Sequence, residues 1–222
     1  MKGAKITPAV EDYLKGIFVL EEETQPVIAA RVATEIGVSA STMFSALRRL
    51  EREGYVRVER RKEIHLTGKG KRVAEGILRR HFLTERLLTD LLGLDWVKAH
   101  QEAHRLEHAI SAEVEEKLDK LLNHPTTCPH GNPIPGSVPV QARHRSAPLH
   151  QVPEGREVIL ECITEGGERD TRLLVFMQHH HLAPGTRIQV METSPSLGTM
   201  SLKVGENVIT LGLEAAKKIR VQ

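Results

Sequence analysis

The chain has 222 residues, a formal net charge of +2 and an apolar content of 40%, values typical of a soluble globular protein with one large or two small domains. No apolar run approaches the ~20 residues of a membrane span. The amino-terminal residues 1–5 lead into a polar helix, which excludes a secretory signal, and we expect a cytoplasmic protein. Two cysteines, Cys128 and Cys162, do not make a disulfide scaffold.

The first 75 residues have the pattern of a helix-turn-helix unit. Apolar residues at helical spacing predict a helix over residues 10–22 and a shorter one over residues 27–36. Gly37 follows, where a left-handed helix terminus favours glycine. Ser39 or Ser41 then caps a third helix that ends near Glu53. Two helices joined by a tight glycine-containing turn form the helix-turn-helix motif.

A basic hairpin follows this motif. Residues 55–66 alternate between apolar and charged side chains, which predicts a two-stranded wing with its tip at residues 59–63. Between Arg48 and Arg72 there are ten Lys or Arg against four Glu, a local excess of six positive charges. Such an excess favours DNA binding, with the second helix of the motif in the major groove. The alternative is a winged helix that binds another protein, in which the basic side chains are simply exposed to solvent.

The predicted DNA contacts are of two kinds. Side chains at the start of the second helix of the motif face the bases, and arginines on that helix and the wing meet phosphate, which supplies affinity rather than sequence choice. The predicted base-facing residues are Ser39, Ser41, Thr42 and Ser45, and the predicted phosphate contacts are Arg48, Arg49, Arg60 and Arg61.

Two longer helices are predicted next, over residues 70–92 and 96–122. In the second, His100, His104 and His108 fall at i, i+4 and i+8, and Glu107 lies three residues after His104. A helix brings residues three and four apart to one face. Imidazole and carboxylate groups on one face predict a site for a divalent transition metal, whereas chance histidines on a solvated face are the alternative. A leucine-rich stripe on the first helix indicates a core or a dimer interface.

Residues 124–153 hold seven of the eleven prolines, which predicts a linker without regular secondary structure. Within it, Cys128 and His130 are two residues apart and could chelate a metal, although the residues alone favour an ordinary loop.

Residues 154–222 alternate between short strands and turns, which predicts a small β-barrel. Strands are expected over residues 156–164, 186–192, 199–204 and 207–211, followed by a helical turn over residues 213–218 and a last short strand. The triplet of residues 179–181 is three consecutive histidines. Consecutive residues of an extended segment point to opposite faces, so we expect these histidines at the surface and not on one ion.

Taken together, these motifs resemble the family of iron- and manganese-dependent transcriptional regulators that includes the diphtheria toxin repressor and the manganese transport regulators. The resemblance rests on motifs in a shared order over about residues 7–136. They are Glu11-Asp12-Tyr13-Leu14, Leu50-Glu51-Arg52-Glu53-Gly54, Leu66-Thr67-Gly68-Lys69-Gly70, His81 with Glu85-Arg86-Leu87-Leu88, His100 with Glu107-His108, and Cys128-Pro129-His130-Gly131-Asn132-Pro133-Ile134-Pro135. The carboxy-terminal region resembles the SH3-like domain of that family.

The resemblance implies a mainly α fold with a small β domain. It divides the chain into a winged helix-turn-helix domain over residues 1–72, a metal-binding and dimerisation domain over residues 73–140, a linker over residues 141–153 and an SH3-like domain over residues 154–222. It also implies a homodimer that binds a palindromic DNA operator when loaded with metal and represses metal-uptake genes. Binding of the metal would set the angle of the DNA-binding unit.

The resemblance further implies two groups of metal ligands. The primary group is Asp12, His104, Glu107 and His108. The second uses His81, Glu85 and His100, or, as in streptococcal relatives, Glu85, Cys128 and His130 with an acid from the carboxy-terminal domain, for which we predict Asp170. The oxygen ligand of Asp12 favours manganese over iron(II) or zinc, although imidazole suits all three ions.

Two other classes of function remain open from the sequence. One is a small metallohydrolase, but the chain has no His-Glu-x-x-His motif, no phosphate-binding glycine loop and no evident nucleophile. We therefore expect no enzymatic activity. The other is a winged-helix regulator that does not respond to metal and whose histidines are structural.

Overall fold

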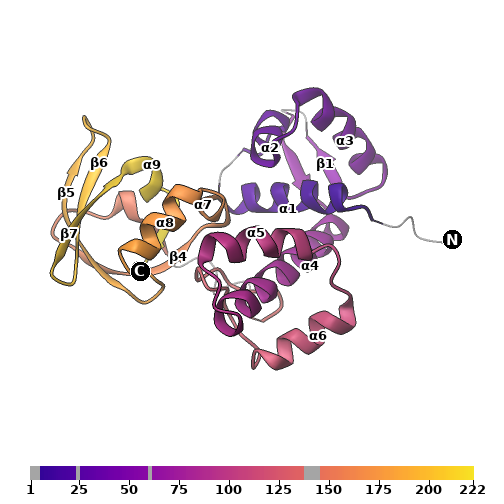
Figure 1. The fold of residues 1–222 in the computed structure, drawn as a ribbon. Coiled ribbons are helices and arrows are strands. Elements are labelled where there is room, and N and C mark those ends of the chain that lie inside the picture. Colours follow the sequence, from indigo (N-terminus) through magenta and orange to yellow (C-terminus); the bar gives the residue numbers. More distant parts are fainter. Residues whose placement is uncertain (1–5, 24–25, 60–61, 138–145) are drawn as a thin grey trace. The chain divides into compact units, whose positions relative to one another are not determined.

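The computed structural model describes residues 6–23, 26–59, 62–137 and 146–222 (Figure 1). Its backbone contacts divide it into two compact units. Unit 1 comprises Met1–His81 and His104–Ala112, and unit 2 comprises Phe82–Ala103 and Glu113–Gln222. Two helices, α4 (Gly68–Arg86) and α5 (Trp96–Leu106), each contribute residues to both units.

Unit 1 contains the predicted winged helix-turn-helix. Its elements are α1 (Pro8–Glu23), α2 (Ala29–Ile36), α3 (Ala40–Arg52), β1 (Val56–Val58) and β2 (Ile64–Leu66), followed by the first part of α4. The bounds of all three helices lie within two residues of those predicted. Pro8 begins α1, where its missing N–H costs no hydrogen bond, and Leu14 and Ile17 of α1 are fully buried.

The turn between α2 and α3 is set by two residues. Gly37 adopts a left-handed conformation with φ +74° and closes α2 through its N–H, which donates to Thr34 O. Ser39 caps α3, because its side chain accepts a hydrogen bond from the backbone N–H of Thr42. Buried Met43, Leu47 and Leu50 then hold the inner face of α3 against the unit.

The wing is the antiparallel pair β1–β2, in which Val56 pairs with Leu66 and Val58 with Ile64. Ile64 also donates its N–H to Val27 O, which ties the wing to the segment before α2. The predicted phosphate contacts Arg60 and Arg61 lie outside the described residues.

The prediction of one helix over residues 96–122 is wrong. Helix α5 ends at Leu106, and α6 (Ala112–Leu121) begins after a turn over residues 107–111. No proline marks this break, but Ser111 precedes α6, and serine competes for backbone hydrogen bonds and favours helix starts. Acidic residues in the first turn of α6, Glu113 and Glu115, favour a helix N-terminus there.

The end of α4 is also irregular. The predicted helix over residues 70–92 is α4 followed by a single π-helical turn, η1 (Leu87–Leu91), and Gly93 with φ +68°. Leu88 of this turn packs with Ala99 and Ala103 of α5 in unit 2.

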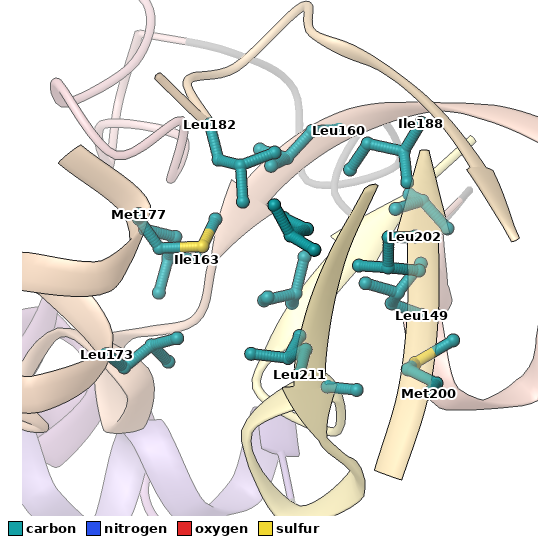
Figure 2. Packing of buried hydrophobic residues seen from close by; sticks show 14 of the residues in the cluster. Leu149, Leu160, Ile163, Leu173, Met177, Leu182, Ile188, Met200, Leu202 and Leu211 are labelled. Atoms are coloured by element: carbon teal, nitrogen blue, oxygen red, sulfur yellow. The ribbon is translucent and has the colours of Figure 1, made fainter. Parts of the chain in front are cut away.

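Unit 2 also contains a six-stranded antiparallel sheet in the order β3-β8-β4-β5-β6-β7. The strands are β3 (Ala147–Pro148), β4 (Glu157–Ile163), β5 (Arg187–Ser194), β6 (Thr199–Val204), β7 (Asn207–Gly212) and β8 (Ile219–Val221), with the helical turn α9 (Leu213–Ala216) before β8. The four longer strands match the predicted ones. Alternate residues, such as Met200 and Leu202 of β6, point into an apolar core together with Ile188 of β5 (Figure 2).

Two helices between β4 and β5 were not predicted. They are α7 (Glu165–Glu168) and α8 (Thr171–His179). Gly166 and Gly167 obscure the first in the sequence, because glycine disfavours helices. Helix α8 is stabilised by the cap of Asp170 on the Leu173 N–H and by burial of Leu173, Leu174 and Met177, two of which are labelled in Figure 2.

Two further expectations are corrected. Residues 147–151 of the predicted linker are regular, because β3 pairs with β8 and a 3₁₀ turn, η3 (Leu149–Gln151), follows it. Leu149 of that turn is completely buried in the core, and its burial outweighs the local effect of the prolines. The histidines of residues 179–181 lie at the end of α8 and in the following turn rather than in an extended segment.

None of the helices in the described ranges combines the length and hydropathy that a membrane span needs.

Candidate metal-binding clusters

Among the described residues, two clusters of potential metal ligands each fall within a single unit. Cluster 1, in unit 1, consists of Asp12, His104, Glu107 and His108. Cluster 2, in unit 2, consists of Glu85, Cys128, His130 and Glu168. In each cluster every residue offers one ligand atom within 4.8 Å of the others. The grouping of cluster 1 matches the predicted primary group of ligands.

Cluster 1 joins α1 to the end of α5. Asp12 lies in the second turn of α1, His104 in the last turn of α5, and Glu107 and His108 in the turn that follows. His108 Nε2 lies 3.2 Å from Asp12 Oδ1 and 3.7 Å from Glu107 Oε1, and His104 Nδ1 lies 3.1 Å from Glu107 Oε1. The end of the helix at Leu106 therefore lets neighbouring residues 107 and 108 serve the same cluster.

Glu107 is completely buried at the centre of cluster 1. Its carboxylate accepts a hydrogen bond from Lys15 Nζ at 3.1 Å and contacts His81 Nδ1 closely. Burial by itself would raise the pKa of Glu107, but the positive charge of Lys15 and the hydrogen bonds with His104 and His81 outweigh it and hold the pKa well below its usual range. Glu107 is thus an anion.

A second carboxylate orients His108. Glu11 Oε2 lies 2.7 Å from His108 Nδ1, and Arg80 donates to Glu11 Oε1 at 2.8 Å. With Nδ1 bound to a carboxylate, the other ring nitrogen of His108, Nε2, faces Asp12 and is the atom that a metal would use. A histidine ligand held by a carboxylate in this way is common in metal sites.

Cluster 2 is built from three segments of unit 2. Glu85 lies near the end of α4, Cys128 and His130 lie in the proline-rich loop, and Glu168 ends α7. The loop closes on itself, because the Cys128 N–H donates to Asn132 O and Thr127 forms a β-bridge with Pro133.

The loop of cluster 2 is fixed from two sides. Arg86 donates to the carbonyl oxygens of Thr127 at 2.8 Å and Cys128 at 3.2 Å. Gly131 has φ +94°, and a Cβ there would lie 2.1 Å from the carbonyl oxygen of Glu161. Only glycine fits this approach of the loop to β4 without a shift of the backbone.

The donor atoms of cluster 2 are close together and buried. His130 Nδ1 lies 3.2 Å from Glu168 Oε1 and 3.4 Å from Glu85 Oε2, and Cys128 Sγ lies 3.6 Å from Glu168 Oε1. His100 reaches the same carboxylates from α5, with Nδ1 2.9 Å from Glu85 Oε1 and 3.4 Å from Glu168 Oε2.

The buried carboxylates of Glu85 and Glu168 give cluster 2 a negative electrostatic potential. Burial opposes the charged form of His100, but hydrogen bonds with Glu168 and Glu85 prevail and raise the pKa of His100 to about 10. The pKa of His130 is raised well above its usual value, again against the effect of burial, by the charges of Glu168 and Glu85. Burial and the charge of Glu168 raise the pKa of the Cys128 thiol. Protons thus balance the carboxylates in the metal-free protein.

The donor set of cluster 2 fits a divalent cation. A cation could replace the protons that now compensate the buried carboxylates. The ring nitrogen of His130 that a cation would use in cluster 2 is Nδ1, because it lies 3.9 Å from Cys128 Sγ and close to both carboxylates. Carboxylate, imidazole and thiolate together suit iron, zinc and cobalt, whereas the oxygen and nitrogen donors of cluster 1 also suit manganese.

Two histidines one turn apart on α5, His100 and His104, belong to different units and make different contacts. His104 belongs to unit 1 with His108, whereas His100 belongs to unit 2, where it meets Glu85. His81 falls in unit 1 and Glu85 in unit 2, so the prediction that His81, Glu85 and His100 share a site stays a prediction.

The carboxylate that the structure brings beside Cys128 and His130 is that of Glu168, whereas the predicted Asp170 has other contacts. Asp170 Oδ1 accepts from the Leu173 N–H and Oδ2 accepts from Lys218 Nζ at 3.0 Å, so this carboxylate caps α8 and pairs with a lysine. The sequence offers three acids here, Glu165, Glu168 and Asp170. Which one reaches Cys128 depends on the unpredicted helix α7, and no local signal distinguishes it.

The predicted base-facing residues lie at the start of α3 and are exposed, as are Arg48 and Arg49. Ser39 Oγ contacts the hydroxyls of Ser41 and Thr42 at 2.9 and 2.8 Å. Arg49 Nε forms an ion pair with Glu53 Oε1 at 2.8 Å. The neighbouring Arg48 is also exposed. The exposed side of α3 therefore carries mostly polar side chains that could contact DNA, together with one large apolar residue, Phe44.

Family models match three parts of the chain. Residues 5–64 match the model described as iron dependent repressor, N-terminal DNA binding domain. Residues 67–136 match iron dependent repressor, metal binding and dimerisation domain, and residues 147–222 match the FeoA domain.

Similar proteins cover nearly the whole chain. The chain is 35% identical over 226 residues to the iron-dependent repressor IdeR of Mycobacterium leprae, which covers 98% of both chains. Among solved structures, one titled "Manganese-dependent transcriptional repressor complex with manganese" has a TM-score of 0.86 at 32% identity and covers 96% of this chain and 98% of that chain. The structure of the manganese regulator SloR has a TM-score of 0.81 at 30% identity, with coverage of 98% and 99%.

Proposed function

The chain belongs to the family of iron-dependent repressors, and from this premise we propose that cluster 1 is the site through which a divalent metal controls its binding to DNA. The protein is a metal-dependent transcriptional repressor of the iron- and manganese-responsive kind. The observation that carries the proposal is the position of cluster 1, whose ligands come from α1 and from the end of α5 within the same unit as the helix-turn-helix.

The proposed ligands of cluster 1 are Asp12 Oδ1, His104, Glu107 Oε1 and His108 Nε2. A bound divalent ion supplies two positive charges that hold these four side chains together. Helix α1 packs against α2 and β2, so a fixed position of Asp12 on α1 stabilises one arrangement of the DNA-binding elements. If metal binds that arrangement better than others, the population shifts toward it. A coupling of ~1–3 kcal/mol gives roughly 5–150-fold tighter DNA binding.

Cluster 2 is proposed as a second metal site with Glu85, Cys128, His130 and Glu168 as ligands and His100 beside them. Its residues come from α4, the proline-rich loop and α7, so a metal there would join the segments of unit 2. The proposed metal for cluster 1 is Mn²⁺, with Fe²⁺ and Zn²⁺ as the other candidates, because its donors are oxygen and nitrogen only.

We further propose that the protein acts in the cytoplasm as a homodimer on a palindromic operator of metal-uptake genes. A match to a metal-binding and dimerisation domain over residues 67–136 supports the dimer. The domain boundaries at residues 72/73 and 140/141 and the start of the last domain at residue 154 also stay proposals.

The test is DNA binding under controlled metal supply. Binding to the protein's own promoter region is measured with chelator and then with Mn²⁺, Fe²⁺ and Zn²⁺ at buffered free concentrations. We expect tight binding only with metal, and its loss in His104→Ala and in Glu107→Gln. His124→Ala is the matched control, because this exposed histidine lies after α6 and pairs only with Asp119 among the described contacts.

The outcomes separate the alternatives. Equal binding with and without chelator would support a winged-helix regulator that ignores metal. Absence of binding in every condition would contradict the DNA-binding proposal itself.

A further inference from the structure

We propose that Lys15 and His81 are positioning residues that hold Oε2 of Glu107, so that Glu107 offers only Oε1 to a metal in cluster 1. We also propose that the charge of Lys15 lowers the affinity of this cluster and so sets the metal concentration at which it fills. The inference rests on the proposed function of cluster 1.

Lys15 is a buried cation beside the cluster. It is 3% exposed on α1, one turn after Asp12, and its Nζ lies 3.1 Å from Oε2 and 3.4 Å from Oε1 of Glu107. A buried ammonium group needs a charged partner to offset its lost hydration. Glu107, with no exposed surface, is such a partner.

The two oxygens of Glu107 have different surroundings. Oε2 contacts Lys15 Nζ and His81 Nδ1. Oε1 lies 3.1 Å from His104 Nδ1 and 3.7 Å from His108 Nε2. The contacts at Oε2 therefore orient the carboxylate, and its other oxygen points to the remaining donors of cluster 1.

The same contact has an electrostatic consequence. An ion bound at Oε1 would lie close to the ammonium group of Lys15, because Nζ is only 3.4 Å from that oxygen. Repulsion between like charges is screened little at buried positions. Lys15 thus supports the geometry of Glu107 while it opposes the ion.

The test compares Lys15→Met, which removes the charge and keeps the length of the side chain, with Lys15→Arg, which keeps the charge. Both are made in a Glu168→Gln background, so that cluster 2 is weakened and cluster 1 dominates the measurement. Mn²⁺ affinity is measured at pH 7.5 by electron paramagnetic resonance, which also records the symmetry of the bound ion. Circular dichroism confirms that each variant is folded.

We expect Lys15→Met to bind Mn²⁺ at least tenfold more tightly and with an altered spectrum, and Lys15→Arg to resemble its parent. His81→Ala should weaken binding, and His81→Asn, which keeps a donor near the position of Nδ1, should restore part of it. Equal or weaker binding by Lys15→Met would overturn the inference. Should that variant not fold, Lys15→Gln replaces it, and the same criterion applies.

Failure of the proposed function has a different signature. In that case the parent would bind no ion, or binding would survive His104→Ala. If the parent binds through His104 and Lys15→Met changes nothing, only the role of Lys15 is refuted.

Discussion

The indole ring of Trp96 meets the imidazole of His130 edge to face, with ring centroids 4.9 Å apart and an interplanar angle of 79°. Trp96 is the only tryptophan of the chain, and His130 belongs to cluster 2. The intrinsic fluorescence of the protein therefore arises beside the candidate second metal site, which makes the occupation of that site directly observable.

We predict that Co²⁺ quenches the tryptophan emission as cluster 2 fills, because a paramagnetic ion quenches a nearby indole and cobalt suits the donors of this cluster. The measurement is a fluorescence titration at pH 7.5. Glu168→Gln should require at least tenfold more metal for the same effect. His104→Ala is the control, since His104 belongs to cluster 1, and its titration should follow the parent. Identical curves for Glu168→Gln and the parent would contradict the assignment of cluster 2.

We expect Glu168 to bind metal in cluster 2 and Asp170 to stabilise helix α8. Asp170→Ala should leave the affinity of cluster 2 unchanged but cost about 1 kcal/mol of stability, because it removes the cap of α8. Asp170→Asn keeps a capping oxygen and should recover most of that loss. Urea unfolding of the metal-free protein gives the stability, and the tryptophan titration gives the affinity. A large drop in metal affinity for Asp170→Ala would restore Asp170 as a ligand.

Metal binding at cluster 2 should release protons. The pKa of His100 is about 10, and the pKa values of His130 and Cys128 are also raised, so near neutral pH these groups hold protons in the absence of metal. A ligand must lose its proton, and affinity therefore rises with pH, roughly tenfold per unit for each proton displaced. Calorimetric titrations at pH 5.5 and 7.5 measure this, and equal affinities would refute it.

Arg48 on α3 should contribute to DNA affinity without regard to sequence. Arg48→Ala should weaken binding to operator DNA and to unrelated DNA by the same factor, because one phosphate contact is lost. The slope of the logarithm of the binding constant against the logarithm of the salt concentration should fall in magnitude by about one. Arg187→Ala is the matched control, since this exposed arginine lies on β5 and pairs with Glu157. Fluorescence anisotropy at several salt concentrations gives both values. An unchanged salt slope for Arg48→Ala would exclude this contact.

Gly131 should be sensitive to a single methyl group. Gly131→Ala would place Cβ 2.1 Å from Glu161 O at a positive φ, at a cost of about 1–3 kcal/mol, and should displace the loop with Cys128 and His130. Gly76→Ala is the control, because a Cβ there meets nothing within 4 Å in the middle of α4, and alanine favours a helix over glycine by up to about 1 kcal/mol. Thermal unfolding should shift in opposite directions for the two variants.

Much of the fold was predictable because its signals are local. The spacing of apolar residues predicted α1 to α3 and the main strands, and Gly37 and Ser39 predicted the turn and the cap between the motif helices. The same reasoning failed at residues 107–111, where the chain leaves the helix although no proline or glycine is present. A buried carboxylate at Glu107, held by Lys15 from another helix, is not visible in local periodicity.

Local signals in the sequence were enough to predict the winged helix-turn-helix, because helix periodicity, caps and turns depend on neighbours along the chain. The grouping of Asp12 with His104, Glu107 and His108 came from the family motifs instead. The contacts of His100 with Glu85, of Glu168 with Cys128 and His130, and of Lys15 with Glu107 were not predictable and became visible only in the folded chain. These outcomes depend on burial, where an unpaired charge is costly, and burial is set by how distant segments pack.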